Sequence, residues 1–245
     1  MLHMSYFYVI FKMVLRIRYI FKGQIFRRVV LYMKIGIIRV LSINDDNELN
    51  HHGRIIERIT NFQCITRCIE NQPYGIYDEK TEKEAIPKIV NLAKRMEKKD
   101  KVSVIIISCA ADPGLKQVRN ELSIPVIGAG ESGALVARAL SRHIGVLTIT
   151  DDIPNRMKTI LGSNVQMAKP KNVTNVIDLY DPNNSNNLLS AVEDLLERGS
   201  EVIVFACTGF STMGYRQKLI DSMGIRIVDS VEAAGVLASY FIKHN

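Results

Sequence analysis

Short apolar runs rich in Ile and Val alternate with amphipathic stretches along most of the chain, beginning near residue 34. Such runs, bounded by polar turns, are typical of buried parallel strands. We expect strands at 35–41, 64–69, 102–108, 124–128, 144–150, 173–180, 201–206 and 225–229. The stretches between them predict helices at 83–98, 115–122, 131–142, 153–161, 185–198, 214–223 and 231–243. This alternation predicts an α/β fold with mostly parallel sheets.

The second half of the chain repeats the pattern of the first. IGIIRVLSINDD at 35–46 resembles IGVLTITDD at 144–152, and VIIISCAADPG at 104–114 resembles VIVFACTGF at 202–210. SIPVIGAGESGALVARAL at 123–140 resembles GIRIVDSVEAAGVLASYF at 224–241, in the same order. The repeat predicts two pseudo-symmetric α/β lobes, 33–130 and 131–245, after an N-terminal extension of residues 1–32. The boundary near 130–143 is left open, because the last helix of each half can pack against the other lobe.

Two cysteines occupy equivalent places in this repeat. Cys109 and Cys207 each end an apolar strand and precede a polar turn that leads into a helix. After Cys109, Asp112 suits an N-cap and Pro113 suits the first helical position. Ligands of open α/β sheets bind outside the carboxyl ends of the strands, and a helix N-terminus there lowers the pKa of a thiol. Two thiols facing one carbon suit a two-base reaction, in which one removes a proton and the other returns a proton to the opposite face. Buried core thiols are the simpler alternative, and a disulfide between the two is left open.

These residues carry a resemblance to the Asp/Glu/hydantoin racemase superfamily of cofactor-independent racemases, over about residues 33–243. It rests on SCAADPG with Cys109, ACTG with Cys207 and IGVLTIT at 144–150, and the hydantoin-racemase-like members look most similar. The resemblance implies two flavodoxin-like lobes with the active site in the cleft between them, no cofactor and no metal. It also implies that Cys109 and Cys207 are the acid/base pair. Expected substrate contacts are the residues after each cysteine and at the end of each lobe's first strand: Arg39, Ser42, Ala110, Ala111, Asp112, Thr148, Thr150, Thr208 and Gly209.

The end of the first strand departs from the family pattern. Glutamate racemases carry an Asp-Ser pair there, and hydantoin and allantoin racemases tend to carry an Asn-Pro-Asn type of turn. This chain has Arg39-Val40-Leu41-Ser42 instead. Arg39 can bind a carboxylate with two hydrogen bonds, which favours a carboxylate-bearing substrate, or it can form a salt bridge at the lobe interface. The expected function is racemisation or epimerisation at the Cα of an amino acid or a hydantoin-type compound.

Three alternative functions remain. Gly128, Gly130 and Gly133 form G-x-G-x-x-G between a strand and a helix, with Asp151 18 residues further on, as in NAD(P)-binding oxidoreductases. The repeat argues against that reading, because DSVEAAG in the second half lacks the first two glycines. Related proteins also include cis–trans isomerases of small dicarboxylates, and a sensor on the same scaffold would bind a ligand without exchanging its Cα proton. The arylmalonate decarboxylases keep only one of the two cysteines, so the presence of both argues against that reaction.

The net charge of +7 arises almost entirely from the first 33 residues, which contain six basic residues and no acidic one. The rest of the chain is nearly neutral, so we expect no nucleic-acid partner. We expect a small-molecule substrate and a homo-oligomer.

Residues 1–32 are too interrupted by charge for a spanning helix or a signal peptide. They indicate either an amphipathic segment on a membrane surface or, as we favour, a start codon chosen too far upstream. The lack of a signal peptide predicts a cytoplasmic location.

Cys64 and Cys68, with His51 and His52 upstream, have poor spacing for the four ligands of a zinc site, so we expect no zinc there.

Overall fold

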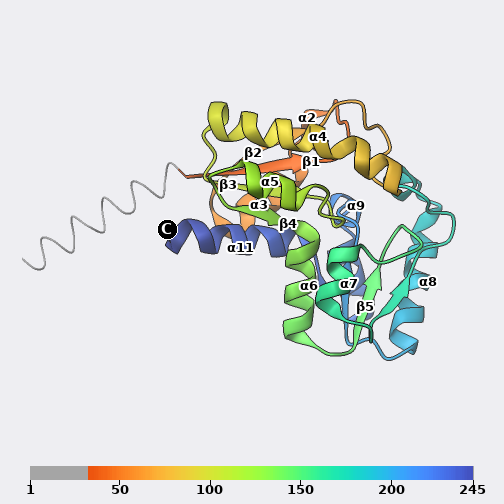
Figure 1. Ribbon diagram of the computed structural model, residues 1–245. Coiled ribbons are helices and arrows are strands. Elements are labelled where there is room, and N and C mark those ends of the chain that lie inside the picture. The colour runs from red at the N-terminus through yellow and green to blue at the C-terminus, as the bar shows by residue number, and fades with distance from the viewer. Residues whose placement is uncertain (1–32, 245) are drawn as a thin grey trace, which may run out of the picture. The chain divides into compact units, whose positions relative to one another are not determined.

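The computed structural model describes residues 33–244, which form two four-stranded parallel sheets (Figure 1). The expected α/β architecture is confirmed. The first sheet has the order β2-β1-β3-β4, with β1 Lys34–Arg39, β2 Gln63–Cys68, β3 Val104–Ser108 and β4 Val126–Gly128. The second has the order β6-β5-β7-β8, with β5 Ile144–Leu147, β6 Gln166–Ala168, β7 Val202–Phe205 and β8 Arg226–Val228. Each order is that of a flavodoxin-like sheet, in which the first and third strands lie side by side at the centre.

Helices connect consecutive strands in both lobes. In the first lobe they are α2 Asp46–Leu49, α3 His51–Thr60, α4 Glu79–Arg95 with a π-helical turn η1 Met96–Asp100, α5 Leu115–Glu121 and α6 Ala129–Leu140. In the second they are α7 Asn155–Leu161, the 3-10 helix η2 Val176–Tyr180, α8 Asn184–Glu197, α9 Gly209–Thr212, α10 Tyr215–Met223 and α11 Ser230–His244. None of the helices among the described residues is long and apolar enough to cross a membrane. The two interpretations of residues 1–32 concern a segment outside the described residues.

The last helix of each half packs on the other lobe. α6 lies against α7 and β7, and its Ala134 and Ala137 belong to the core of the second sheet. α11 runs along the first lobe and packs against α3 and β3 (Figure 1). Gly235 of α11 faces Ile56 of α3 so closely that a Cβ there would lie 2.9 Å from the Ile56 side chain. The exchanged helices therefore hold the carboxyl ends of the two sheets at a fixed relative position.

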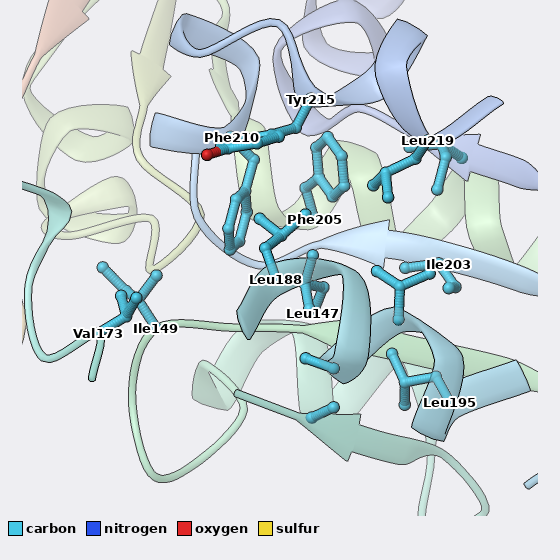
Figure 2. Packing of buried hydrophobic residues seen from close by; sticks show 14 of the residues in the cluster. Leu147, Ile149, Val173, Leu188, Leu195, Ile203, Phe205, Phe210, Tyr215 and Leu219 are labelled. Atoms are coloured by element: carbon cyan, nitrogen blue, oxygen red, sulfur yellow. The ribbon is translucent and has the colours of Figure 1, made fainter. Parts of the chain in front are cut away.

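Three aromatic rings pack together in the core of the second lobe. Phe205 at the end of β7 and Phe210 in α9 are fully buried, with ring centroids 5.1 Å apart, and Tyr215 stacks edge-on against Phe210 (Figure 2). Leu188 of α8 and Leu219 of α10 belong to the same cluster. Burial of these side chains fixes the backbone on both sides of Cys207, because Phe205 and Phe210 flank it in sequence.

Two segments differ from the sequence-based expectation. The strand predicted at 173–180 is wrong: Asn175 accepts a hydrogen bond from the Ile177 N–H, and Asp178 accepts bonds from the Thr174 and Asn175 N–H groups. These side chains satisfy the backbone locally and favour the 3-10 helix η2 over a strand. The edge strand β6 lies earlier, at Gln166–Ala168, and α3 was not predicted. α3 contains Gly53 and few apolar residues, and its buried face is formed by His52, Gly53, Ile56 and Thr60.

Candidate functional site

A cleft of about 520 Å³ lies between the two lobes, at the carboxyl ends of the central strands. The first lobe lines it with residues that end or follow β1 and β3 and with the loop before α4. The second lobe lines it with the segments that follow β5 and β7. In each sheet the chain leaves one central strand toward one edge of the sheet and the other central strand toward the opposite edge. Such a point is the usual ligand site of open α/β sheets, because adjacent loops separate there.

Two thiols line this cleft from opposite lobes. Cys109 follows β3 directly, and Cys207 follows β7 after Ala206. Both are free thiols with partly exposed side chains. The backbone N–H of Gly209 donates to the Cys207 sulfur, at 3.4 Å. Because β3 and β7 are equivalent central strands, the fold brings the two cysteines of the repeat to one cavity.

Burial raises the pKa of both thiols. It raises the pKa of Cys207 to about 11, and backbone hydrogen bonds from Gly209 and Phe210 and the charge of Arg39 offset only part of the effect. The pKa of Cys109 is raised by a larger amount, again mainly by burial, and the negative charges around it add to the rise. The expected lowering by a helix N-terminus is therefore outweighed. The helix after Cys207, α9, has only four residues and carries a small dipole.

Arg39 brings the charge of a guanidinium to the cleft. Its side chain is 4% exposed. Nη1 donates to the carbonyl oxygens of Glu48 and Leu49, at 3.1 and 3.4 Å, and Nη2 donates to the Thr212 hydroxyl across the lobe interface, at 3.4 Å. No carboxylate among residues 33–244 forms a salt bridge with it. At the lobe interface Arg39 forms a hydrogen bond to a hydroxyl in place of the salt bridge that the sequence left open. Burial lowers the pKa of Arg39 to about 10, which leaves it charged at neutral pH.

A fully buried histidine joins the lobes behind the two thiols. The His52 Nδ1 lies 2.8 Å from the hydroxyl oxygen of Ser108, the residue before Cys109. Its Nε2 lies 2.9 Å from the hydroxyl oxygen of Thr212, in the helix after Cys207. The Thr208 hydroxyl adds a direct link by donating to the Ser108 carbonyl, at 3.2 Å. His52 lies outside every sequence motif, and only the fold of α3 places it here.

Comparison with known proteins identifies the family. The model of the family described as Asp/Glu/Hydantoin racemase matches residues 58–238, which is most of the chain. The chain belongs to the Asp/Glu/hydantoin racemase family. Similar proteins include hydantoin racemases from Rhizobium meliloti, 31% identical over 147 residues, and from Paenarthrobacter aurescens, 25% identical over 153 residues. These alignments cover 56% and 60% of this chain and 59% and 64% of the relatives. The chain thus aligns with about three fifths of the length of the curated relatives.

Solved structures of family members share the fold. An allantoin racemase from Klebsiella pneumoniae has a TM-score of 0.71 at 20% identity, over 86% of this chain and 87% of that one. A glutamate racemase from Bacillus anthracis has a TM-score of 0.64 at 17% identity, over 87% of this chain and 83% of that one. At these identities the likeness shows the two-lobed fold of the family. It leaves the substrate of this chain to be argued from its own cleft.

Most of the expected substrate contacts line the cleft, and three do not. Those that line it, besides the two cysteines, are Arg39, Ala110, Ala111, Thr150, Thr208 and Gly209. Ser42 instead donates to the Ile69 carbonyl and accepts from the Gln72 N–H, which ties two loops together. Thr148 is fully buried, and its hydroxyl bonds to that of Thr150 at 2.9 Å.

Asp112 is the third expected contact that the structure places elsewhere. It is buried at 5% exposure and caps α6, accepting from the backbone N–H of Gly130 at 2.9 Å and of Glu131 at 2.6 Å. It is not the N-cap of α5, as its sequence position suggested, because Gly114 takes that place. The donors that a dinucleotide phosphate would use at the start of α6 are therefore already taken by a carboxylate, which removes the basis for the NAD(P)-binding alternative.

Several cleft residues were missed by sequence reasoning. They come from the loop before α4 and its first turns, from the segment after β5, and from η2; among them are Tyr77, Asp78, Glu79, Glu82, Asp151, Asp152, Asn155 and Val176. The loop 71–78 follows a strand on the expected active face, which was the available signal. Gln72 of that loop is buried, and its amide donates to the Gly75 and Thr81 carbonyls, so it shapes the loop and does not line the cleft. In residues 33–244 no group of three or more His, Cys, Asp or Glu side chains is suited to hold a metal ion.

Proposed function

We propose that the protein is a cofactor-independent racemase or epimerase that exchanges the Cα proton of a small substrate between Cys109 and Cys207. One observation carries the proposal: two free, partly exposed thiols at equivalent strand ends of the two lobes line one cleft. Membership of the racemase family supports it. The similar proteins named as hydantoin, allantoin and glutamate racemases favour a substrate whose Cα–H is adjacent to a carbonyl or carboxylate.

The proton transfer is balanced without an added reagent. One cysteine, as thiolate, takes the Cα proton and becomes a thiol, and the electron pair of the broken C–H bond moves into the adjacent carbonyl group. The other cysteine, as thiol, gives its proton to the opposite face of Cα as the electron pair returns, and becomes the thiolate. The substrate configuration is inverted, and the two sulfurs have exchanged roles.

Cys207 is the thiol that loses its proton more readily. Burial raises the pKa of both thiols, but backbone hydrogen bonds from Gly209 and Phe210, and then the charge of Arg39, offset part of the rise at Cys207, whereas the pKa of Cys109 is raised further. We assign Cys207 as the first base and Cys109 as the first proton donor. The assignment predicts faster proton exchange for the enantiomer that presents its Cα–H to Cys207.

Proton NMR in D2O tests the proposal. We would incubate the protein with D- and L-5-substituted hydantoins, allantoin, aspartate and glutamate, and follow the loss of the Cα–H signal. Cys109→Ser and Cys207→Ser are each expected to reduce the exchange rate by at least about 100-fold, since a serine hydroxyl is a far weaker acid. Cys64→Ser is the matched control, because Cys64 is a partly buried thiol that does not line the cleft. Exchange that survives both active-cleft substitutions would refute the two-thiol mechanism.

Two further expectations stay predictions. Light scattering on the purified chain tests the expected homo-oligomer, and fractionation of the source cells tests the expected cytoplasmic location.

A further inference from the structure

The guanidinium of Arg39 has an unused pair of donors. A guanidinium carries five N–H groups in a fixed plane. Three of them donate to the Glu48 and Leu49 carbonyls and to the Thr212 hydroxyl. The Nε–H and the second N–H of Nη2 have no hydrogen-bond partner among the described residues. The Nε and Nη2 side of a guanidinium can bind both oxygens of a carboxylate through two parallel hydrogen bonds.

The charge of Arg39 is also uncompensated by an ion pair. Glu48, the carboxylate whose charge raises the pKa of Arg39, accepts a hydrogen bond from the Tyr180 hydroxyl and forms no salt bridge with Arg39. A cation that is 4% exposed is costly to bury unless an anion or a full set of hydrogen-bond partners accompanies it. Because Arg39 lines the cleft, a ligand can supply the missing anion.

The acidic residues around the cleft differ in whether they have a salt-bridge or hydrogen-bond partner. Asp151 pairs with Lys169, Asp152 pairs with Lys158, and Glu79 pairs with Lys83. Asp78 caps α4 by accepting from the Thr81 N–H. Glu82, in the first turns of α4, lines the cleft and has neither a salt bridge nor a hydrogen bond from its carboxylate among the described residues. The cleft therefore contains one cation and one carboxylate that lack partners.

We propose that the Nε/Nη2 edge of Arg39 binds the carboxylate of the substrate and that Glu82 receives its ammonium group, so that the substrate is a free α-amino acid and not a neutral hydantoin. The inference rests on the proposed function in that it concerns the same cleft. It assigns Arg39, at the end of β1, as the residue that determines substrate class. Each charge of an amino-acid zwitterion then has one complementary group that lines the cleft.

Direct binding tests this assignment independently of catalysis. Calorimetry would compare three compounds with one side chain: methionine, N-carbamoylmethionine and 5-(2-methylthioethyl)hydantoin. Wild type is expected to bind methionine most tightly. Arg39→Gln should weaken methionine and N-carbamoylmethionine by at least about tenfold, because each loses a charge-assisted hydrogen-bond pair, and should change hydantoin binding less than twofold. Glu82→Gln should weaken methionine alone.

Two variants separate anion binding from a structural role of Arg39. Arg39→Lys keeps the charge and loses the planar fork, so an intermediate loss of carboxylate binding is expected even if Arg39→Gln fails to fold. Arg54→Gln is the matched control, since Arg54 is an exposed arginine that also donates to a carbonyl near α2. The inference is overturned if Arg39→Gln weakens all three compounds equally, or if wild type binds only the hydantoin or none of them. Amino-acid binding that persists without proton exchange would refute the proposed function and leave the assignment of Arg39 intact.

Discussion

His52 offers the sharpest test of how the two lobes are held together. Its ring is completely buried between Ser108 and Thr212, and both ring nitrogens are in hydrogen-bond contact with hydroxyl groups. Burial, and then the positive charge of Arg39 and of the neighbouring His51, lower its pKa well below the usual value of 6.5. The folded protein therefore keeps His52 neutral at a pH where the unfolded chain protonates it.

The sign and size of the effect follow from linkage. Because the folded-state pKa of His52 is depressed, its contribution to stability is present above pH 6.5 and is lost as the pH falls toward the folded-state value. Each pH unit in that window costs up to about 1.4 kcal/mol of unfolding free energy. Between pH 7.5 and pH 5 the loss from this one residue is at most about 2 kcal/mol, because pH 5 lies about 1.5 units below the ordinary pKa of 6.5. His52→Gln keeps a hydrogen-bonding side chain of similar reach and cannot titrate.

Urea denaturation of wild type and His52→Gln at the two pH values measures this contribution. Other groups titrate in both proteins, so the quantity of interest is the difference between their unfolding free energies. We expect the unfolding free energy of wild type to exceed that of His52→Gln by about 1–3 kcal/mol at pH 7.5, because the glutamine fits the two hydroxyls less well. At pH 5 this lead should be smaller, by up to about 2 kcal/mol. His143→Gln is the control for removing an exposed histidine. A lead that does not change with pH would refute the reasoning that His52 is buried in its neutral form.

Three other measurements test the packing and the thiols. Gly130→Ala should lower the unfolding free energy by about 3 kcal/mol or more in thermal denaturation, because the new Cβ would lie 1.9 Å from the Ala110 carbonyl oxygen. Phe210→Ala should cost about 3–5 kcal/mol in urea denaturation, since the ring is fully buried against two other aromatic rings. Iodoacetamide at pH 9 should modify Cys207 before Cys109, as followed by peptide mass spectrometry, because the pKa of Cys109 is raised further. Equal rates, or faster labelling of Cys109, would contradict that order.

The features predictable from the sequence are those that depend on short-range pattern. Runs such as VIIIS at 104–108 are apolar on both faces because helices cover both sides of the sheet, and the pattern alone places them in a parallel strand. The repeat then placed Cys109 and Cys207 at equivalent strand ends. The two strands belong to different sheets, so the expectation that their ends meet in one cleft came from the resemblance to the racemase family and not from the pattern.

The features missed are those in which a side chain has its partner far away in sequence. His52 acts through residues 56 and 160 positions further on, Ser108 and Thr212, and α3 carries too few apolar residues to be recognised as a helix. Asp112 was expected to contact the substrate, but its carboxylate accepts from the backbone N–H groups of Gly130 and Glu131, 18 and 19 residues further on. Local pattern reports which residues are buried, and it does not report which polar partners they find after folding.

The glycine motif at 128–133 shows how a tertiary contact can imitate a binding signature. In the first lobe the cap of α6 comes from outside the helix, from the Asp112 carboxylate. A Cβ on Gly128 would lie 2.4 Å from its oxygen, and a Cβ on Gly130 would lie 1.9 Å from the Ala110 carbonyl oxygen. In the second lobe the cap of α11 comes from Asp229, which occupies the position equivalent to Gly128 and accepts from the Val231 N–H at 2.8 Å. The cap is then local and no carboxylate from outside the helix approaches, so the position equivalent to Gly128 carries a side chain. The two lobes thus cap equivalent helices from different places in the chain. Gly128 follows from that choice and Gly130 from the Ala110 carbonyl, without any need for a dinucleotide.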